Sequence, residues 1–259
     1  MWNTRSAHPG SDVDTAIETN VDNLNFVSTG LTKADFDPYE QGHVIHARVY
    51  KGFRVAATCA NSKHQGGVAV AWRVEAKGRG KRNFNLESFQ HHGPNCLSYL
   101  CCFGAFKWPI VVAYLLPDTL EDLHHVQAAF DHFGPDRTRP MLMADLNVDL
   151  YSPSPDIGTR MVADFLAANG MEDMLQHFHS RRRFRHQKTW YQKRYNPDGT
   201  IQTTISSRTD CILTAPFLRC HFRNMQLVDP RTHKSDHYMI KATIKGAPRK
   251  AQRQYLQGL

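Results

Sequence analysis

Acidic and amide side chains stand at the end of one apolar run of the sequence. Residues 140–144 have the pattern of a buried strand, and the run stops on Asp145, with Asn147 two residues later. Asp and Asn are common turn residues, so a simple strand end is one interpretation. The same side chains supply the oxygen ligands that hard cations prefer. The spacing therefore leaves two interpretations open, a turn or a metal or phosphate site at the carboxyl edge of a sheet.

Other polar side chains have the same relation to apolar runs. Asp210 stands directly before one run, Asp236 and His237 stand before another, and Tyr114 lies near the end of a third. Each of these residues alone is more often a turn or surface residue than part of a catalytic site. Because each stands beside a segment that should be buried, all of them could face one sheet edge. Their types and their order together favour a shared site.

The positive charge of the chain is concentrated in one stretch. The sequence has 32 Lys and Arg and 24 Asp and Glu, a net charge of +8. Residues 179–194, HSRRRFRHQKTWYQKR, hold seven of the basic residues and no acid, so that removing them leaves 25 basic against 24 acidic residues. Such a patch suits a phosphate polymer, although a solvated loop has a similar composition. Phe184, Trp190 and Tyr191 interleave with the basic residues, where they could stack on bases or anchor the loop to the core.

The elements that would position these residues are mostly strands. Apolar runs rich in Val and Ala at 52–60 and 66–74 predict strands, as do the apolar runs at 96–106, 108–116, 140–144, 210–217 and 237–244. Helical spacing of apolar residues predicts a helix over 119–133, capped by Thr119, and a second over 156–170, ended by Gly170. Helices that fall between many strands favour an α/β protein with two sheets over a regular βαβ alternation.

Composition limits where the protein acts. No run approaches eighteen apolar residues, and the N-terminal residues lack the apolar stretch of a secretory signal. The six cysteines form no CxxC pair and no zinc-finger spacing, and they read as reduced core thiols. We therefore expect an intracellular protein without a membrane partner.

The ordered motifs resemble one known superfamily. The order Asn3, Tyr114, Asp145-x-Asn147, Asp210 and Asp236-His237 is similar to that of the endonuclease/exonuclease/phosphatase superfamily, which includes DNase I, apurinic/apyrimidinic endonucleases and the nicking domains of non-LTR retrotransposons. The segments GGVAVAWR, GPNCLSY, VVAYLLP, MADLNVD and RTDCIL are similar to the retrotransposon branch. The resemblance implies a DNase I-like four-layer α/β sandwich, with two packed mixed β-sheets flanked by helices. We expect this domain over 1–245, followed by a basic tail or linker over 246–259.

The resemblance also implies a catalytic set and a cofactor. The implied catalytic residues are Asp145, Asn147, Asp210, His237 and Tyr114, and the implied ligands of Mg²⁺, or of Mn²⁺ as the alternative, are Asn3 and Asp236. Asp145 would activate or position a water, and Asn147 would orient that water or the phosphate. His237, held by Asp210, would donate to a phosphate oxygen that Tyr114 also contacts. The reaction expected from this set is phosphodiester hydrolysis.

DNA is the substrate that the retrotransposon branch implies. The residues expected to bind it are Arg181, Arg182, Arg183, Arg185, Lys188 and Trp190. The pair Thr189–Trp190 in this stretch also resembles the retrotransposon branch. The resemblance further implies a nuclear location and a reverse transcriptase encoded by the parent element as partner. A phosphatase of the same superfamily is an alternative function, but it would not need the basic stretch.

One residue of the superfamily pattern is missing. Its members carry a metal-binding glutamate at the end of the second strand, whereas residues 25–33, NFVSTGLTK, contain no acid. Glu18 and Glu40 are the nearest glutamates and lie in other local patterns. Together with a start inside the first expected strand, this predicts a truncated or decayed copy of a mobile-element reading frame. A catalytically decayed nucleic-acid-binding relic is therefore a further alternative, because a hard-cation site depends on its charged ligands.

Overall fold

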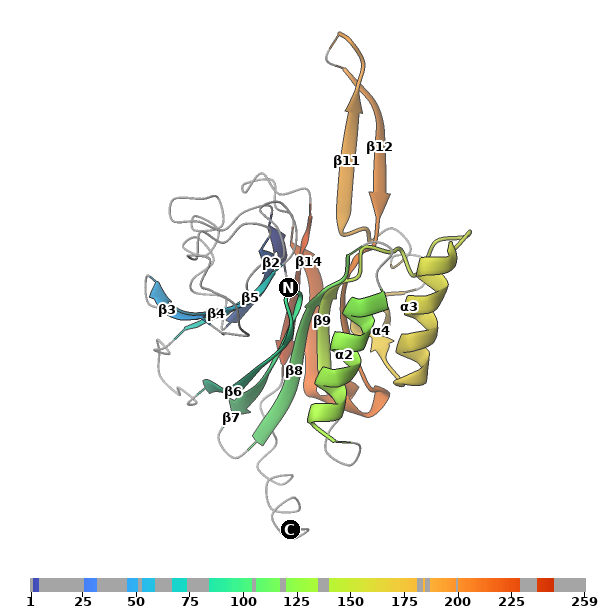
Figure 1. Ribbon diagram of the computed structural model, residues 1–259. Helices are drawn as coiled ribbons and strands as arrows, with labels where there is room; N and C mark the ends of the chain where they lie inside the picture. The colour runs from blue at the N-terminus through green and yellow to red at the C-terminus, as the bar shows by residue number, and fades with distance from the viewer. Residues whose placement is uncertain are drawn as a thin grey trace.

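The computed structural model describes residues 2–4, 26–31, 46–50, 53–58, 67–73, 84–103, 106–116, 120–134, 140–180, 184, 187–198, 200–228 and 237–244. Within these ranges the strands build two larger mixed sheets and two separate two-stranded pairs. The two larger sheets lie face to face, and the helices lie beside one of them (Figure 1).

The first sheet has five strands among the described residues. Its order is β1 (Trp2–Thr4), β2 (Phe26–Leu31), β5 (Val68–Arg73), β4 (Phe53–Ala57) and β3 (His46–Tyr50). Only β1 and β2 run parallel, and the other neighbours in this sheet are antiparallel.

The second sheet has six strands in the described part of the chain and carries most of the candidate site. Its order is β10 (Glu172–Asp173), β13 (Asp210–Thr214), β9 (Met141–Asp145), β8 (Phe106–Tyr114), β7 (Cys96–Phe103) and β6 (Phe84–Gly93). The pair β8 and β9 is parallel, so two strands end at the same edge of this sheet. The separate pairs are β11 (Trp190–Tyr195) with β12 (Ile201–Ser207), and β14 (Phe222–Val228) with β15 (Met239–Ile244).

Helices cover the outer face of the six-stranded sheet. They are α2 (Leu120–His132) and α3 (Ile157–Ala168). The short α4 (Met174–Phe178) and the 3₁₀ helix η1 (Pro216–His221) instead bury Met174, Leu175 and Leu218 in the core between the sheets. Asp156 caps α3 by accepting a hydrogen bond from the Thr159 N–H at 2.7 Å. After α3, Gly170 adopts φ +60°, a left-handed conformation that ends helices and favours glycine. Both helices expected from the sequence are confirmed, whereas the predicted cap Thr119 lies outside the described residues.

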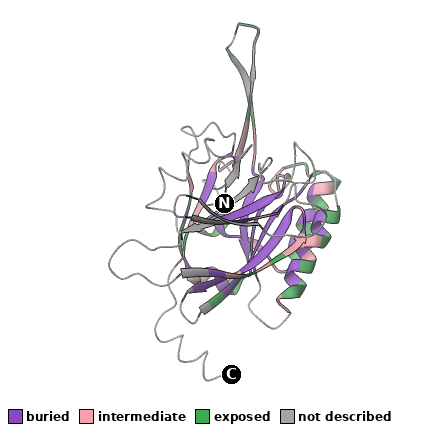
Figure 2. Ribbon diagram, turned by 60° about the vertical axis from the view of Figure 1, so that its left-hand side comes forward, coloured by how far each residue is buried: buried purple, intermediate pink, exposed green. Residues whose placement is uncertain are grey.

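Two apolar cores explain why the central strands are buried on both faces (Figure 2). In β8 and β9, Ile110, Val112 and Met143 face the core between the sheets. The alternate residues, such as Val111 and Leu142, face the core beneath α2 and α3. This alternation decides on which face the polar residues at the strand ends lie.

The α/β architecture with two packed mixed sheets is therefore confirmed. Among the described residues no helix covers the outer side of the five-stranded sheet, so the fourth layer stays a prediction, and the tail 246–259 lies outside the described residues. Five of the six cysteines lie in the described residues and all five are free thiols, four of them buried. No helix among the described residues is long and apolar enough to cross a membrane.

A histidine cluster lies between β6 and α2, and we expect it to make the stability of the fold depend on pH. The His92 ring lies edge-on to His132 at a centroid distance of 5.7 Å, and its Nε2 is 2.8 Å from the Ser98 hydroxyl. Burial, and then the charges of His132, His91 and His125, lower the pKa of His92 to about 4, from an ordinary value of 6.5. Between these two values the unfolded chain binds a proton that the folded chain does not bind. Stability is therefore highest above pH 6.5 and is lost as the pH falls toward 4.

We accordingly expect His92→Gln to lose less stability than the unsubstituted protein between pH 7.5 and pH 5.0. Glutamine retains a polar group near Ser98 but takes up no proton in this range. Urea midpoints of both proteins at the two pH values provide the measurement. Equal losses in the two proteins would show that His92 does not contribute to the acid sensitivity.

Candidate active site

The register of three strands brings candidate residues to one sheet edge. Tyr114 at the end of β8 lies opposite Asp145 at the end of β9, and Asp210 at the start of β13 lies opposite Asp145 on its other side. Every second residue of β8, β9 and β13 faces the other sheet, as Ile110 and Met143 do. Tyr114, Asp145 and Asp210 fall on the same side in this alternation. The three side chains therefore lie on the same face of the sheet, at its edge.

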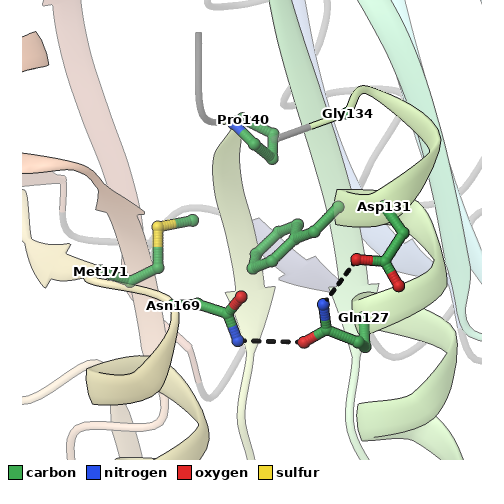
Figure 3. Close-up of a pocket in the computed structure, with 7 residues that line it drawn as sticks. Gln127, Asp131, Gly134, Pro140, Asn169 and Met171 are labelled. Atoms are coloured by element: carbon green, nitrogen blue, oxygen red, sulfur yellow. Dashed lines mark hydrogen bonds between the residues drawn. The ribbon is translucent and has the colours of Figure 1, made fainter. Parts of the chain in front are cut away.

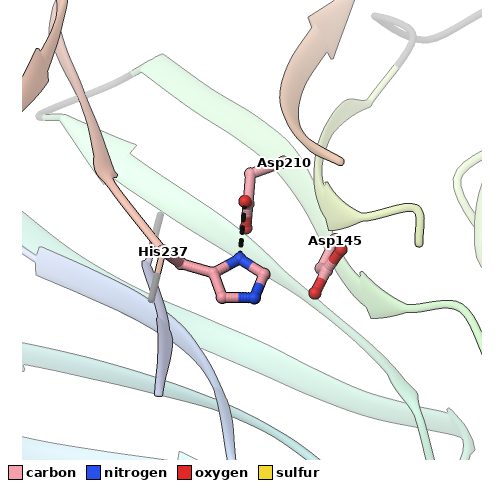
Figure 4. A group of neighbouring side chains, drawn as sticks. All are labelled: Asp145, Asp210 and His237. Atoms are coloured by element: carbon pink, nitrogen blue, oxygen red, sulfur yellow. Dashed lines mark hydrogen bonds and ion pairs between the residues drawn. The ribbon is translucent and has the colours of Figure 1, made fainter. Parts of the chain in front are cut away.

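His237 completes a buried cluster with two of these carboxylates. Its Nδ1 lies 2.9 Å from Asp210 Oδ2, and candidate ligand atoms of Asp145, Asp210 and His237 all lie within 4.8 Å of one another (Figure 4). Asp210 is fully buried, and Asp145 and His237 are 3% and 8% exposed. A carboxylate at Nδ1 favours the proton on that nitrogen and fixes the orientation of the ring. The separate motifs of the sequence thus meet in one place.

Asn147 and Tyr114 are held beside this cluster. Asn147 has φ +52°, and its N–H donates to Asp145 Oδ1 at 3.1 Å. Its side-chain amide donates to the Leu115 carbonyl at 2.5 Å, which fixes the plane of the amide. Burial raises the pKa of Tyr114, and the nearby charges of Asp145 and Asp122 raise it further, against a hydrogen bond with Asn147. The phenol therefore keeps its proton and remains a hydrogen-bond donor.

Comparisons with known proteins agree with this fold. Neither protein-family models nor curated protein sequences match the chain. Among solved structures, it is similar to the endonuclease domain of TRAS1, a telomere-specific non-LTR retrotransposon, with a TM-score of 0.63 and 14% identity over 91% of this chain and 92% of that one. It is also similar to the AP endonuclease LMAP from Leishmania major, with a TM-score of 0.66 and 12% identity over 95% and 86%. A 3′ phosphatase, NExo from Neisseria, gives a TM-score of 0.57 and 17% identity over 94% and 97%.

The chain has the DNase I-like fold of the endonuclease/exonuclease/phosphatase family. This confirms the fold that the ordered motifs implied. At identities of 12–17% the similarity concerns the fold. The chemistry of the site has to be argued from its own residues.

A threonine that the sequence reasoning noted only as part of a Thr-Trp pair positions the site within this endonuclease/exonuclease/phosphatase fold. The fully buried Thr189 hydroxyl oxygen accepts the backbone N–H groups of Thr209 and Asp210, at 3.1 and 3.0 Å. The Thr189 carbonyl accepts the Tyr238 N–H at 2.6 Å, next to His237. One residue therefore ties the strand that carries Asp210 to the segment that carries His237.

We expect Thr189→Val to weaken both stability and any activity of the site. Valine has nearly the same shape but leaves two buried N–H groups without an acceptor, at a cost of about 1–3 kcal/mol each. Thr189→Ser keeps the hydroxyl and should restore most of the loss. Urea unfolding and cleavage rates of the two variants test this, and equal behaviour of valine and serine would contradict it.

The basic segment is partly anchored to the protein. Phe184 is 5% exposed and packs edge-on against Tyr151 at a centroid distance of 4.7 Å. Lys188 forms an ion pair with Asp149 at 2.8 Å, and Trp190 at the start of β11 is paired with His237 in an isolated β-bridge. For Phe184 the anchoring interpretation is therefore the correct one. Nucleic-acid roles for Lys188 and Trp190 stay predictions, and the other residues assigned to DNA, Arg181, Arg182, Arg183 and Arg185, lie outside the described residues.

The two expected metal ligands are described unequally. Asn3 lies on β1, and β1 contacts β15, the strand that begins two residues after His237. The pairing of β1 with β2 places Asn3 opposite Gly30. Strand β2 contains no acidic residue, so the glutamate of the endonuclease/exonuclease/phosphatase pattern has no counterpart on this strand. Asp236 lies outside the described residues, and both ligand roles stay predictions.

Proposed function

We propose that the protein is a Mg²⁺-dependent phosphodiesterase that nicks DNA. The observation that carries the proposal is the buried cluster of Asp145, Asp210 and His237 at one edge of a sheet. Two carboxylates and an imidazole with an acidic partner are the groups that water activation and charge stabilisation at a phosphate require. The nuclease structures with the same fold add support, because their names state activities on nucleic acid or on AP sites.

The residues have distinct roles in the proposed reaction. Asp145 positions the attacking water and accepts its proton as the new phosphorus–oxygen bond forms. The Nε2 side of His237 donates to a phosphate oxygen, while Asp210 keeps the imidazole oriented from the other side. Tyr114 donates a hydrogen bond to the same phosphate, and Asn147 orients the phosphate or the water. The bond from phosphorus to the leaving oxygen breaks, and that oxygen takes up a proton.

The donor set fits a divalent cation. Asp210 Oδ1 is buried and accepts no hydrogen bond from the described residues. A buried carboxylate oxygen is costly unless a donor or a cation satisfies it. Asn3 and Asp236 are the ligands that we assign to Mg²⁺, and a neighbouring imidazole would suit Mn²⁺ as the alternative metal. When bound, the cation would neutralise charge on the phosphate.

The basic hairpin beside the cluster favours an extended nucleic acid as the substrate. The hairpin of β11 and β12 projects from the body (Figure 1), and its base is linked to His237 through Trp190. The strand β11, WYQKRY, continues the basic stretch that precedes it. A surface of this charge suits phosphates flanking the cleaved bond. We propose nuclear DNA as the target and a reverse transcriptase of the parent element as the protein partner.

Nicking of supercoiled plasmid tests the proposal. We expect relaxed circles with Mg²⁺ or Mn²⁺, and none with EDTA. Asp145→Ala should remove the activity, whereas Asp164→Ala on the exposed face of α3 should not. Activity that survives Asp145→Ala would contradict the assigned chemistry. Release of phosphate from small esters without nicking would favour the phosphatase alternative, and salt-sensitive DNA binding without cleavage would favour the non-catalytic relic.

A further inference from the structure

A cavity lies at the start of β9, and the active site lies at the other end of this strand. It encloses about 330 Å³, a size in the range of small-molecule sites. Its lining comes from the C-terminal parts of α2 and α3 and from the start of β9 (Figure 3): Gln127, Phe130, Asp131, Gly134, Pro140, Asn169 and Met171. Pro140 directly precedes the five-residue strand β9 and Asp145 ends it, so roughly 16 Å separates the cavity from the catalytic edge. The cavity is therefore distinct from the proposed nuclease site.

Hydrogen bonds inside the wall use up donors and leave acceptors. The Asn169 amide nitrogen donates to Gln127 Oε1 at 3.1 Å and to the Phe165 carbonyl at 3.0 Å, which engages both of its hydrogens. The Gln127 amide donates in turn to Asp131 Oδ1 at 2.8 Å. These bonds hold the three side chains in fixed positions (Figure 3). The polar wall of the cavity is thus organised around a carboxylate, with few N–H groups left for an acceptor ligand.

The charges around the cavity also favour a cationic ligand over an anionic one. Among the lining residues that the structure describes, Asp131 is the one charged side chain, and none is a lysine or an arginine. The cavity also lies at the C-terminal ends of α2 and α3, whose last carbonyl groups carry partial negative charge. An anionic ligand would be repelled there, whereas a cation would be stabilised.

The rest of the wall is apolar and suits an organic body. Phe130 and Met171 both line the cavity, and Figure 3 shows the Met171 thioether beside it. An aromatic face attracts cations as well as apolar groups, and a thioether is a soft and polarisable contact. Since the volume far exceeds that of a single ion, the ligand needs both a cationic group and an apolar part.

We propose that this cavity binds a small organic cation. Its ammonium, amidinium or guanidinium group lies at Asp131, and its apolar part lies between Phe130 and Met171. Recognition rests on a charge-assisted hydrogen bond to the carboxylate, with shape and apolar contact supplied by the two neighbouring side chains. Nothing in this site depends on phosphodiester chemistry, so it is independent of the proposed nuclease function.

Binding of benzamidine by the full chain, measured without DNA, tests the proposal. Benzamide, a neutral compound of nearly the same shape, and benzoate, an anion, are the matched probes. We expect benzamidine to bind at least ~10-fold more tightly than benzamide, and benzoate to give no binding, because one charge-assisted hydrogen bond separates the probes. Isothermal titration calorimetry gives the affinities. Equal affinities for benzamidine and benzamide would overturn the proposal.

Variants locate the binding. Asp131→Asn removes the charge at an exposed position and should weaken benzamidine binding by ~10-fold or more without unfolding the protein. Asp164→Asn makes the same charge change on the exposed part of α3, outside the cavity lining, and should leave binding unchanged. With ¹³C-methyl methionine, the Met171 resonance, identified through Met171→Leu, should shift on addition of benzamidine. An unshifted Met171 resonance, or equal effects of the two Asp substitutions, would overturn the assigned site.

Discussion

Replacing His237 by alanine is expected to lower the rate of plasmid nicking by about 10²–10⁴-fold, the usual contribution of a positioned acid–base group. His237 Nδ1 contacts a fully buried carboxylate of Asp210 at 2.9 Å, which fixes the orientation of the imidazole. In the alanine variant no other side chain of the cluster can donate from that position. Single-turnover cleavage at saturating Mg²⁺ measures the loss in the catalytic step.

A double variant separates catalysis from structural damage. Asp210→Asn and His237→Ala act on one unit, so the double variant should be little slower than the slower of the two single variants. His177→Ala, on the exposed surface of α4, is the matched histidine control and should retain full activity. If nicking persisted in His237→Ala at the rate of the control, His237 would have no part in the reaction. Losses that multiply in the double variant would show that the two residues act separately.

The fold class and the convergence of the site follow from patterns that the sequence displays. The run before Asp145 is apolar at every position, as expected for a strand covered on both faces, and its burial is continuous in the structure. Polar residues at the ends of such strands can only lie at a sheet edge. Alternation then predicts that Tyr114, Asp145 and Asp210 share a face once the register is known. The register itself depends on pairing between distant segments and has no local signal.

The residues that sequence reasoning missed act through contacts between distant segments. Thr189 lies 20 and 21 residues from the two N–H groups that its hydroxyl accepts. Before the fold is known, a threonine beside a basic stretch has no feature that marks such a role. The only sequence signal was the Thr189–Trp190 pair that the retrotransposon resemblance supplied. Polar networks of this kind become visible only when the strands are placed.

The β11–β12 hairpin, in contrast, had a local signal. Its turn, residues 196–200, reads NPDGT, and such turn residues between β-prone segments are typical of a hairpin. The basic charge of the preceding residues, in contrast, is also typical of a solvated loop. In the structure an antiparallel pair of strands flanks this turn, with pairs from Trp190 opposite Ser207 to Tyr195 opposite Ile201. Charge and strand propensity thus coexist in one element.

A buried ion pair beside the site should dominate the stability of this region. The Arg208 guanidinium donates to Asp173 Oδ2 at 3.0 and 2.6 Å, and both side chains are at most 2% exposed. Arg208 also lies over the Phe184 ring at 4.6 Å. Asp173→Ala leaves the guanidinium buried without its counterion. We expect a loss of about 3–5 kcal/mol in the free energy of unfolding, the usual effect of removing one partner of a buried pair.

Urea unfolding of four variants, Asp173→Ala, Arg208→Met, their double variant and Glu172→Gln, tests this expectation. The double variant Asp173→Ala with Arg208→Met should lose less than the sum of the two single changes, because it leaves no unpaired charge. Glu172→Gln, at the neighbouring position of β10, breaks a half-exposed pair with Arg219 and should cost at most about 1 kcal/mol. A loss in Asp173→Ala no larger than in Glu172→Gln would mean that water or another group satisfies Arg208.

The same pair links stability to the proposed chemistry. Arg208 stands two residues before Asp210, and its guanidinium also contacts the Gln187 carbonyl at 3.3 Å, two residues before Thr189. Arg208 therefore connects the start of β13 to the segment that holds both Thr189 and the basic stretch. In Arg208→Met the cleavage rate should fall although none of the proposed catalytic groups is altered, while the affinity for the metal changes little. A variant that loses stability but retains the full rate of the folded fraction would limit the role of Arg208 to holding the fold.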